Sequence, residues 1–562
     1  MFIANHKETK MNLTARRFFV GVLRGGIALG LCFYTQIGVP AEQKQQPKQT
    51  PKKPAAVQQT KRIGQDEIIP IIDGRPEEGI KNCQKVLDAD PNHLESLYNM
   101  TVAYCQLGEL EKAVAYMRRA IAAGLPPGRF IAGPRDLLKP LGETPEFKRL
   151  LAQQAEKLIH GPMLGCVTDR SARFWVRTAD EAPIQVVVAT KKELFKPAMS
   201  PTIVTDARRD YTAVAEVQRL QPNTVYYYDV LLRGKSTLGP ELPKFRTFPT
   251  AGSRARFEVA FGGGAGYTPM HERMWNTLIG HELTAFLFLG DNVYIDNPTR
   301  PDVQHYTYYR RQSRPEYRRF IASTPIFAIW DDHDFGVNDC FYGSKIDEPA
   351  WKVPVWRVFC NNWNNPGYGG GRRQPGCWFR FSIGDVDFFM LDCRFYRSNP
   401  KEPNPTMLGP AQKAWLLAEL ARSEGTFKVL ASSVPWVLEA KGNSLDTWRG
   451  FQDEREEIFS FLQAKQIDGV VLISADRHRS DLWRIERPEG YPLYEFESSR
   501  LTNIHTHGVM PGSLFGYNKK CSFGKLTFDT TKSDPELTYQ IYNIDNELIH
   551  TFVVKRSAIS HR

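Results

Sequence analysis

The chain has 562 residues, of which 42% are hydrophobic and 24% charged, and its formal net charge is +11. This is an ordinary globular balance, and the length allows two to four domains. Much of the positive excess lies in the first 62 residues and no dense run of Lys or Arg follows. The charge pattern therefore argues against nucleic-acid binding and would mildly favour small anions.

The N-terminal segment has the features of an export signal. Arg16 and Arg17 precede an apolar stretch that reaches Tyr34, and small residues near Ala41 suit cleavage. This resembles a twin-arginine signal, so we expect a signal peptide over 1–41 and a periplasmic or secreted protein with no stable membrane span. An uncleaved signal would instead anchor the chain, although the apolar run falls short of the ~20 residues that a spanning helix needs.

Residues 42–64 are rich in Gln, Lys and Pro, which predicts a disordered linker. Residues 65–160 show helical periodicity and small residues at a 34-residue period, and the spacing resembles tetratricopeptide repeats, as marked by Tyr104, Gly108, Ala113 and Ala120. Fewer than three such repeats rarely fold alone. Two interpretations stay open: a packing spacer against the next domain, or a dock for a protein partner.

The hydrophobic pattern changes from a helical period to a strand-like one after residue 160. Short alternating or apolar runs over 161–250 predict strands, and "LQPNTVYYYDV" resembles an edge of a fibronectin III-like β-sandwich. From 251 to 562, apolar strands alternate with amphipathic helices such as "GPAQKAWLLAEL", which is typical of an α/β domain.

Four apolar strands of this last region end in charged or imidazole side chains. "AFLFLG" leads to Asp291, "PIFAIW" to the Asp331–Asp334 run, "VDFFML" to Asp392, and "DGVVLIS" to Asp476. Ligand sites of α/β sheets collect at the carboxyl ends of strands, so we expect these groups to meet at one rim. So many carboxylates repel one another unless cations neutralise them. For Asp331 and Asp392, a capping or bracing role is the alternative.

The motifs together resemble PhoD-type alkaline phosphatases, which are calcineurin-like metallophosphoesterases. They are Gly290-Asp291-x-x-Tyr294, Trp330-Asp331-Asp332-His333-Asp334, Leu391-Asp392-x-Arg394-x-x-Arg397 and Asp476-x-His478. The resemblance spans about residues 160–555. It implies a four-layer α/β/β/α sandwich, hydrolysis of phosphate mono- or diesters, and a site that holds ferric iron with calcium.

The resemblance also implies a role for each matching residue. Asp291 would bridge two metals, with Tyr294, Asp332, Asp476 and His478 as the other ligands. His333 would assist the leaving group. Arg394 would grip the phosphate, because a planar guanidinium holds two oxygens at once, and Arg397 would add to substrate binding.

One position departs from the family pattern. A Cys ligand is expected after the first strand of the domain, and Gly264 stands there in "FGGGAGYTP". Glycine has no side chain to bind iron, so water or another residue must fill the position, or the iron site is altered. His505 and His507, in "TNIHTHG", could be further ligands, although histidines in a polar loop are more often solvated.

We therefore predict an exported hydrolase of phosphoesters that uses metal-activated water. The alternative is an exported protein that binds phosphorylated ligands or partners through a degraded metal site. A relative of purple acid phosphatases is a third hypothesis, disfavoured because Asp-Asp-His and Asp-x-His replace the Asn-His-Glu and His-x-His of that group. The substrate stays open, and nucleic acid enters only as one candidate diester.

Overall fold

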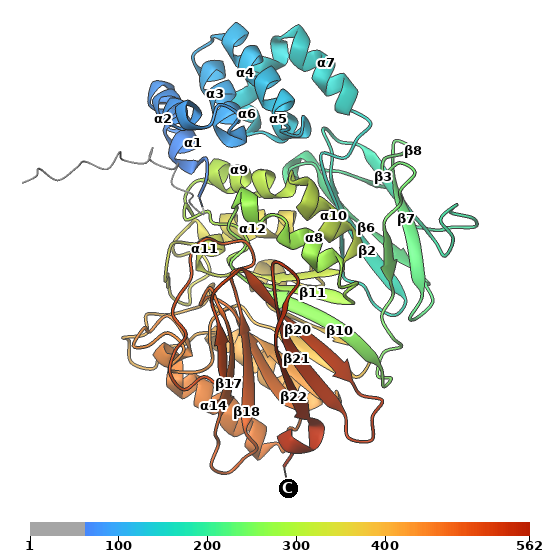
Figure 1. Ribbon diagram of the computed structural model, residues 1–562, viewed down its shortest axis with the longest axis vertical. Coiled ribbons are helices and arrows are strands. Elements are labelled where there is room, and N and C mark those ends of the chain that lie inside the picture. Colours follow the sequence, from blue (N-terminus) through green and yellow to red (C-terminus); the bar gives the residue numbers. More distant parts are fainter. Residues whose placement is uncertain (1–61, 562) are drawn as a thin grey trace, which may run out of the picture. The chain divides into compact units, whose positions relative to one another are not determined.

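The computed structural model describes residues 62–561. The predicted signal peptide and nearly all of the predicted linker therefore lie outside the described residues. Figure 1 shows the order of the elements along the chain. Among residues 62–561, every helix is too short or too polar to span a lipid bilayer.

The chain begins with helices that share a hydrophobic core of their own. Gly79 of α2 is required there, because a Cβ atom at this position would lie 2.3 Å from Cγ1 of Ile71 in α1. Tyr306 from the later helix α9 is part of the same core. The helices are α1 (Gln65–Ile72), α2 (Pro76–Ala89), α3 (Leu94–Gln106), α4 (Leu110–Ala122), α5 (Gly128–Ala132), α6 (Arg135–Leu138) and α7 (Pro145–Gln154).

The strands after these helices divide between two sheets. Six of them form one sheet: β3 (Pro183–Ala189), β4 (Ala198–Met199), β5 (Ile203–Val204), β7 (Val225–Leu232), β8 (Lys235–Ser236) and β9 (Lys244–Arg246). The other three pair with one another at the end of a larger sheet: β1 (His160–Gly165), β2 (Ser171–Arg177) and β6 (Thr212–Gln218).

This division differs from a sandwich confined to residues 161–250. Gly165 of β1 pairs in parallel with Ile326, so the sheet runs on into the following domain. The side chain of Asn365 extends the join, because it accepts a hydrogen bond from the backbone nitrogen of Ala328 (3.0 Å) and donates one to its carbonyl (2.7 Å). Backbone groups at this junction are thus satisfied by a neighbouring segment that strand periodicity does not reveal.

The larger sheet has nine strands in the order β22-β21-β20-β10-β11-β12-β1-β2-β6, and β10, β11 and β12 run parallel. Its further strands are β10 (Arg256–Gly262), β11 (Ala285–Leu289), β12 (Ile326–Ile329), β20 (Ser522–Asp529), β21 (Glu536–Asn543) and β22 (Leu548–Lys555).

A seven-stranded sheet has the order β13-β14-β15-β16-β18-β17-β19, with β14, β15, β16 and β18 parallel. Its strands are β13 (Phe379–Ile383), β14 (Val386–Met390), β15 (Phe427–Ala431), β16 (Val470–Ser474), β17 (Ser480–Ile485), β18 (Leu493–Ser498) and β19 (Phe515–Tyr517). The two sheets pack against each other through aromatic rings, for example Phe327 on Phe381 at 3.8 Å and Phe496 on Tyr539 at 4.5 Å between centroids.

Helices contribute large side chains to both sheets. Trp275 of α8 and Phe320 of α10 contact Phe288 and Phe286 of β11, with ring centroids 6.0 and 5.3 Å apart. On the seven-stranded sheet, Glu419 of α13 pairs with an arginine of β13. The helices are α8 (Met274–Ile279), α9 (Pro301–Gln312), α10 (Pro315–Ser323), α11 (Asp332–Phe335), α12 (Lys352–Asn362), α13 (Gly409–Arg422) and α14 (Gln452–Ala464).

The strands that end in charged residues therefore belong to two facing sheets rather than to one. β11 and β12 are neighbours in the nine-stranded sheet, and β14 and β16 flank β15 in the other. An isolated parallel bridge between Gly263 and Ser499 links the ends of β10 and β18. The carboxyl ends of both parallel groups thus lie at a common edge.

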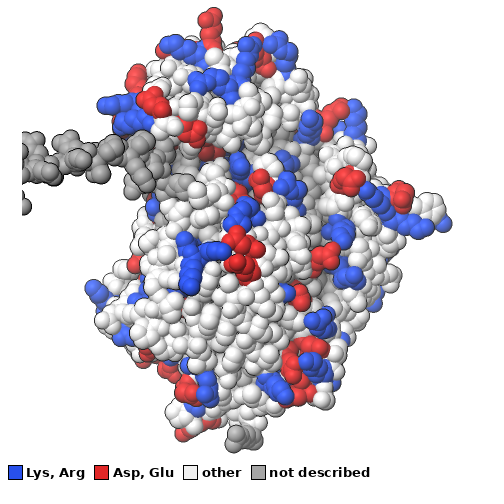
Figure 2. All heavy atoms as spheres, viewed as in Figure 1, with Lys and Arg blue, Asp and Glu red and all other residues white. Residues whose placement is uncertain are grey.

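On the face drawn in Figure 2, basic and acidic side chains are interspersed without a continuous basic stripe.

Candidate metal centre

The turn that carries Asp291 is held by the side chain of Asp334. This carboxylate accepts hydrogen bonds from the backbone nitrogens of Asn292 (3.2 Å), Val293 (2.9 Å) and Asp331 (3.0 Å). Burial raises the pKa of Asp334 to about 8. Asp291 itself has a left-handed backbone, with φ at 53°, a conformation that is uncommon outside glycine and recurs at functional sites.

The hydroxyl of Tyr294 lies among three polar side chains in a fully buried position. It donates to Oδ2 of Asp291 (2.7 Å), lies 3.1 Å from Nε2 of His478, and accepts a hydrogen bond from Nδ2 of Asn503 (2.6 Å). His478 Nε2 is also 3.5 Å from Asp291 Oδ2. Burial raises the pKa of Tyr294 well above its ordinary value, and the charge of Asp291 raises it further. A phenolate at this place therefore requires a multivalent cation.

Asp332 and His333 stand in the first turn of α11, directly after β12. His333 Nδ1 is 2.5 Å from Oδ1 of Asp296. Burial alone would lower the pKa of His333, but the carboxylates of Asp332, Asp291 and Asp296 outweigh it and raise that pKa to about 9. One ligand atom each from Asp291, Asp332 and His333 lie within 4.8 Å of one another, and all three residues are buried.

Asp331 and Asp392 act as braces in this structure. Asp331 caps α11 in a capping box with Asp334. Asp392 accepts hydrogen bonds from the indole nitrogen of Trp330 (2.8 Å) and from the backbone nitrogens of Cys377, Arg394 and Phe395 (each 2.9 Å). The bracing alternative therefore describes both carboxylates.

Asp476 belongs to a group of acidic side chains around one lysine. Its carboxylate is 3.2 Å from the ammonium of Lys441, which is also 2.8 Å from Asp446 and 3.1 Å from Asp339. Asp476 and His478 both have left-handed backbones, with φ at 71° and 50°. The segment is therefore not an extended strand, in which alternate residues project alike, and His478 contacts Tyr294. The joint placement of Asp476 and His478 in one metal shell stays a prediction.

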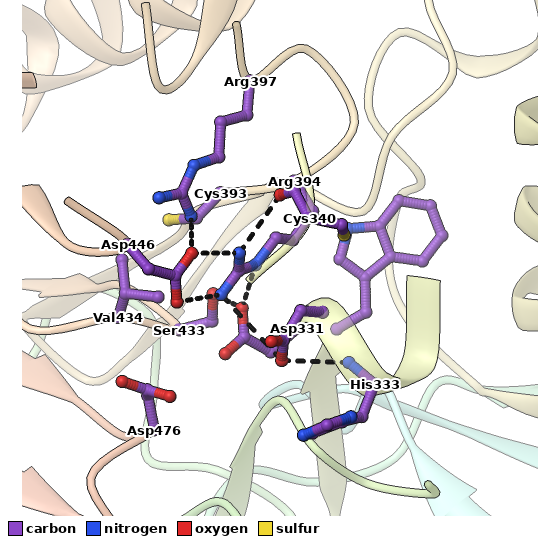
Figure 3. A network of polar contacts seen from close by, with 12 residues as sticks. Asp331, His333, Cys340, Cys393, Arg394, Arg397, Ser433, Val434, Asp446 and Asp476 are labelled. Atoms are coloured by element: carbon purple, nitrogen blue, oxygen red, sulfur yellow. Dashed lines mark hydrogen bonds and ion pairs between the residues drawn. The ribbon is translucent and has the colours of Figure 1, made fainter. Parts of the chain in front are cut away.

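The structure places Arg394, the predicted phosphate grip, in a buried network of ion pairs (Figure 3). Its guanidinium is fully buried and donates to Asp331, to both oxygens of Asp446 (2.7 and 3.3 Å) and to the carbonyl of Cys340 (3.3 Å). Arg397 is 1% exposed and lies 2.8 Å from the same Asp446. Both arginines neutralise buried carboxylates instead of facing a substrate. The motif alone does not separate these roles, because Asp446 is far away in sequence.

Gly264 lies beside His478. A Cβ atom at this position would be 3.3 Å from Cδ2 of His478 and 2.9 Å from the backbone nitrogen of Arg500, and φ is +67°. His505 and His507 surround the same imidazole, and one nitrogen from each of the three histidines lies within 4.8 Å of the others. His505 is exposed and His507 is half-buried. Histidine nitrogens are therefore available beside Gly264, the position where the family pattern has a cysteine ligand.

Sequence reasoning missed three contributors to this centre. Asn503 lies within "TNIHTHG", where the two histidines are the more obvious ligand candidates. Asp296 is the last residue of the segment that follows the strand and begins at Asp291. A second carboxylate so close to a candidate ligand is a signal that the sequence does contain. Lys441 carries no signal in the sequence, because it reaches Asp476 from the irregular loop after β15.

Three family models match the chain. A tetratricopeptide repeat model matches residues 71–125, a domain of unknown function (DUF7800) matches 155–250, and the PhoD-like phosphatase model matches 257–543. Among curated proteins, alkaline phosphatase D of Bacillus subtilis is 24% identical over 356 residues, which are 53% of this chain and 58% of that protein. The human FK506-binding protein-like protein is 41% identical over 52 residues, which are 9% of this chain and 15% of its own length.

Two solved structures share the fold. One titled "Structure of PhoD" has a TM-score of 0.58 at 18% identity and covers 70% of this chain and 89% of its own. A purple acid phosphatase from yellow lupin (Lupinus luteus) seeds has a TM-score of 0.51 at 14% identity, covering 71% and 75%. The match to the B. subtilis protein spans less than two thirds of that protein. The PhoD-like phosphatase model, however, covers just over half of the 562 residues, and its span includes Asp291, Tyr294, Asp332, His333 and His478. The chain belongs to the PhoD-like phosphatase family.

Proposed function

We propose that this chain is a metal-dependent phosphoester hydrolase. One observation carries the proposal: side chains from the ends of three strands meet in one buried place, namely Asp291 and Tyr294 after β11, Asp332 and His333 after β12, and His478 after β16. Family membership supports the same reaction class.

The residues fit a bound cation. Carboxylate and phenol oxygens suit hard ions such as calcium and ferric iron, and an imidazole suits iron. The candidate ligands are only 2–4% exposed, namely Asp291, Asp332, His333 and His478. Buried carboxylates are costly unless an opposite charge compensates them, and a bound cation would supply that charge. Asp291, Tyr294 and His478 would hold the iron, and Asp291 with Asp332 the calcium. Asp476 would join them by exchanging the ammonium of Lys441 for a metal.

The side chains have separate tasks in hydrolysis. When bound, the cations supply an activated water and offset the negative charge of the phosphoryl oxygens. Asp296 holds Nδ1 of His333, and His333 donates a proton from Nε2 to the leaving oxygen. Asn503 fixes the hydroxyl of Tyr294. Lys441, which is 12% exposed, adds positive charge near the site in place of the buried Arg394.

The proposed location, partner, layer arrangement and substrate class rest on the sequence patterns. The segment 1–41 would direct export to the periplasm or the medium, and the helical segment would bind a protein partner. The catalytic domain would be a four-layer α/β/β/α sandwich, preceded by a fibronectin III-like unit. The substrate would be a phosphate mono- or diester, with nucleic acid as one candidate.

The test replaces Asp291 by Asn. We expect this change to lower turnover of p-nitrophenyl phosphate and bis-p-nitrophenyl phosphate, assayed with added Ca²⁺, by at least about 100-fold. Asp302→Asn, at an exposed position of α9, is the matched control and should keep the wild-type rate. Wild-type turnover of both substrates by the Asp291→Asn variant would end the proposal.

A binding protein for phosphorylated ligands is the second candidate. It is favoured by Gly264, which offers no ligand, and by Lys441, which already neutralises Asp476. Elemental analysis of the wild-type protein together with its turnover separates the two candidates. Bound metal without hydrolysis supports the binder, and bound metal with hydrolysis supports the enzyme.

A further inference from the structure

The first residue of α1 and the residues just before it contact the loops of the candidate metal centre. Gln65 donates a hydrogen bond from Nε2 to the carbonyl of Tyr294 (2.6 Å), and Arg310 of α9 donates to the carbonyl of Ile63. The start of the helical segment therefore lies on the backbone of the loop that carries Tyr294, although about 230 residues separate the two in sequence.

Close packing fixes the path of this segment. Gly64 has φ at +83°, and a Cβ atom there would lie 2.1 Å from the hydroxyl oxygen of Tyr306. The carbonyl of Gly64 accepts a hydrogen bond from Asn99 of α3 (3.0 Å). Only glycine fits between α3 and α9, so Arg62, two residues earlier, leaves the helical segment in a set direction.

Arg62 reaches the residue that holds the candidate proton donor. Its Nε donates to Oδ2 of Asp296 at 2.5 Å, and the other oxygen of Asp296 is 2.5 Å from Nδ1 of His333. The side chain of Asp296 is 13% exposed and that of Arg62 is 36% exposed. One carboxylate thus accepts from a guanidinium on one side and contacts an imidazole on the other.

This arrangement restricts the imidazole. A carboxylate that contacts only a histidine can rotate about its own side-chain bonds, and the ring can follow. A second, charged donor on the far oxygen fixes the carboxylate plane, and the ring orientation with it. Asp296 also has an uncommon left-handed backbone, with φ at 54°. The ion pair with Arg62 helps to hold the loop in this conformation.

We propose that Arg62 is a positioning residue of the catalytic centre, which the N-terminal helical segment supplies to orient His333 through Asp296. The inference rests on the proposed hydrolase function. It gives the helical segment a task in the reaction, beyond packing or docking.

The variants are Arg62→Met, Arg62→Lys and the control Arg75→Met. The guanidinium of Arg75 is exposed and pairs with Asp73 and Glu78 near the start of α2. For Arg62→Met we expect kcat to fall by about 10–100-fold with KM little changed, and to fall further for phenyl phosphate than for p-nitrophenyl phosphate. A poorer leaving group depends more on a well-placed proton donor. Arg62→Lys should recover part of kcat, and Arg75→Met should match the wild type.

A second measurement does not depend on turnover. Hydrogen–deuterium exchange of the peptide over 292–297 should be faster in Arg62→Met than in the wild type and in Arg75→Met. Unchanged exchange, or an unchanged kcat in an active wild type, would overturn the inference. A rise in KM alone would also overturn it, because that result makes Arg62 a direct phosphate contact. If the wild type hydrolyses neither ester, the proposed function fails, and the exchange result still decides whether Arg62 fixes the loop.

Discussion

Replacing Arg394 by Leu should destabilise the protein instead of weakening its affinity for substrate. The guanidinium is fully buried and neutralises Asp331 and Asp446, so its removal leaves two buried carboxylates with less compensation. Breaking one side of such a network costs about 3–5 kcal/mol. At about 2–4 °C per kcal/mol in domains of 150–250 residues, the midpoint of thermal unfolding should fall on the order of 10 °C.

The assay follows thermal unfolding of the wild type and of the variant by tryptophan fluorescence, alongside KM for p-nitrophenyl phosphate. Arg380→Leu is the matched control. That arginine also pairs with two carboxylates, Asp387 and Glu419, but it is 28% exposed, and Asp387 keeps hydrogen bonds from Ser382 and Ser423. Its loss should therefore cost only about 1 kcal/mol. An Arg394→Leu protein with a wild-type melting temperature and a raised KM would refute the structural role and restore the phosphate-grip assignment.

Two further predictions concern stability elsewhere. Burial raises the pKa of Glu67 to about 7, so the folded state binds a proton more tightly than the unfolded state, and stability falls as the pH rises from about 4.5 to 7, by up to about 3 kcal/mol. Glu67→Gln removes this loss, so its melting temperature should exceed that of the wild type by more at pH 8 than at pH 5; an equal difference at both would contradict the burial argument. Gly264→Ala should cost about 1–3 kcal/mol in chemical denaturation, because its Cβ atom would lie 2.9 Å from the nitrogen of Arg500 at a positive φ. An unchanged denaturation midpoint would show that the backbone can relax there.

Strand ends were the most predictable part of the centre. Buried strands appear in the sequence as continuous apolar runs, so the positions of Asp291, Asp332 and His478 follow from local pattern alone. The side-chain partners did not follow, because Asp446 and Lys441 come from a loop without periodicity and meet Arg394 and Asp476 only after folding.

The sequence pattern also did not predict which sheet each of the early strands joins. Alternation predicts that residues 171–177 form a strand, but not which sheet the strand joins. That choice depends on a single pairing between Gly165 and Ile326 and on the asparagine amides beside it. The signal peptide predicted over 1–41 stays a prediction, since it lies outside residues 62–561.

The join between β1 and β12 matters for anyone who wishes to produce the phosphatase-like region by itself. A fragment cut at residue 257 would lack β1, and one side of β12 would then present unpaired backbone amides and carbonyls to solvent. Exposed edges of this kind recruit strands from other molecules and lead to aggregation. A soluble shortened protein should therefore begin ahead of His160, not at the family boundary.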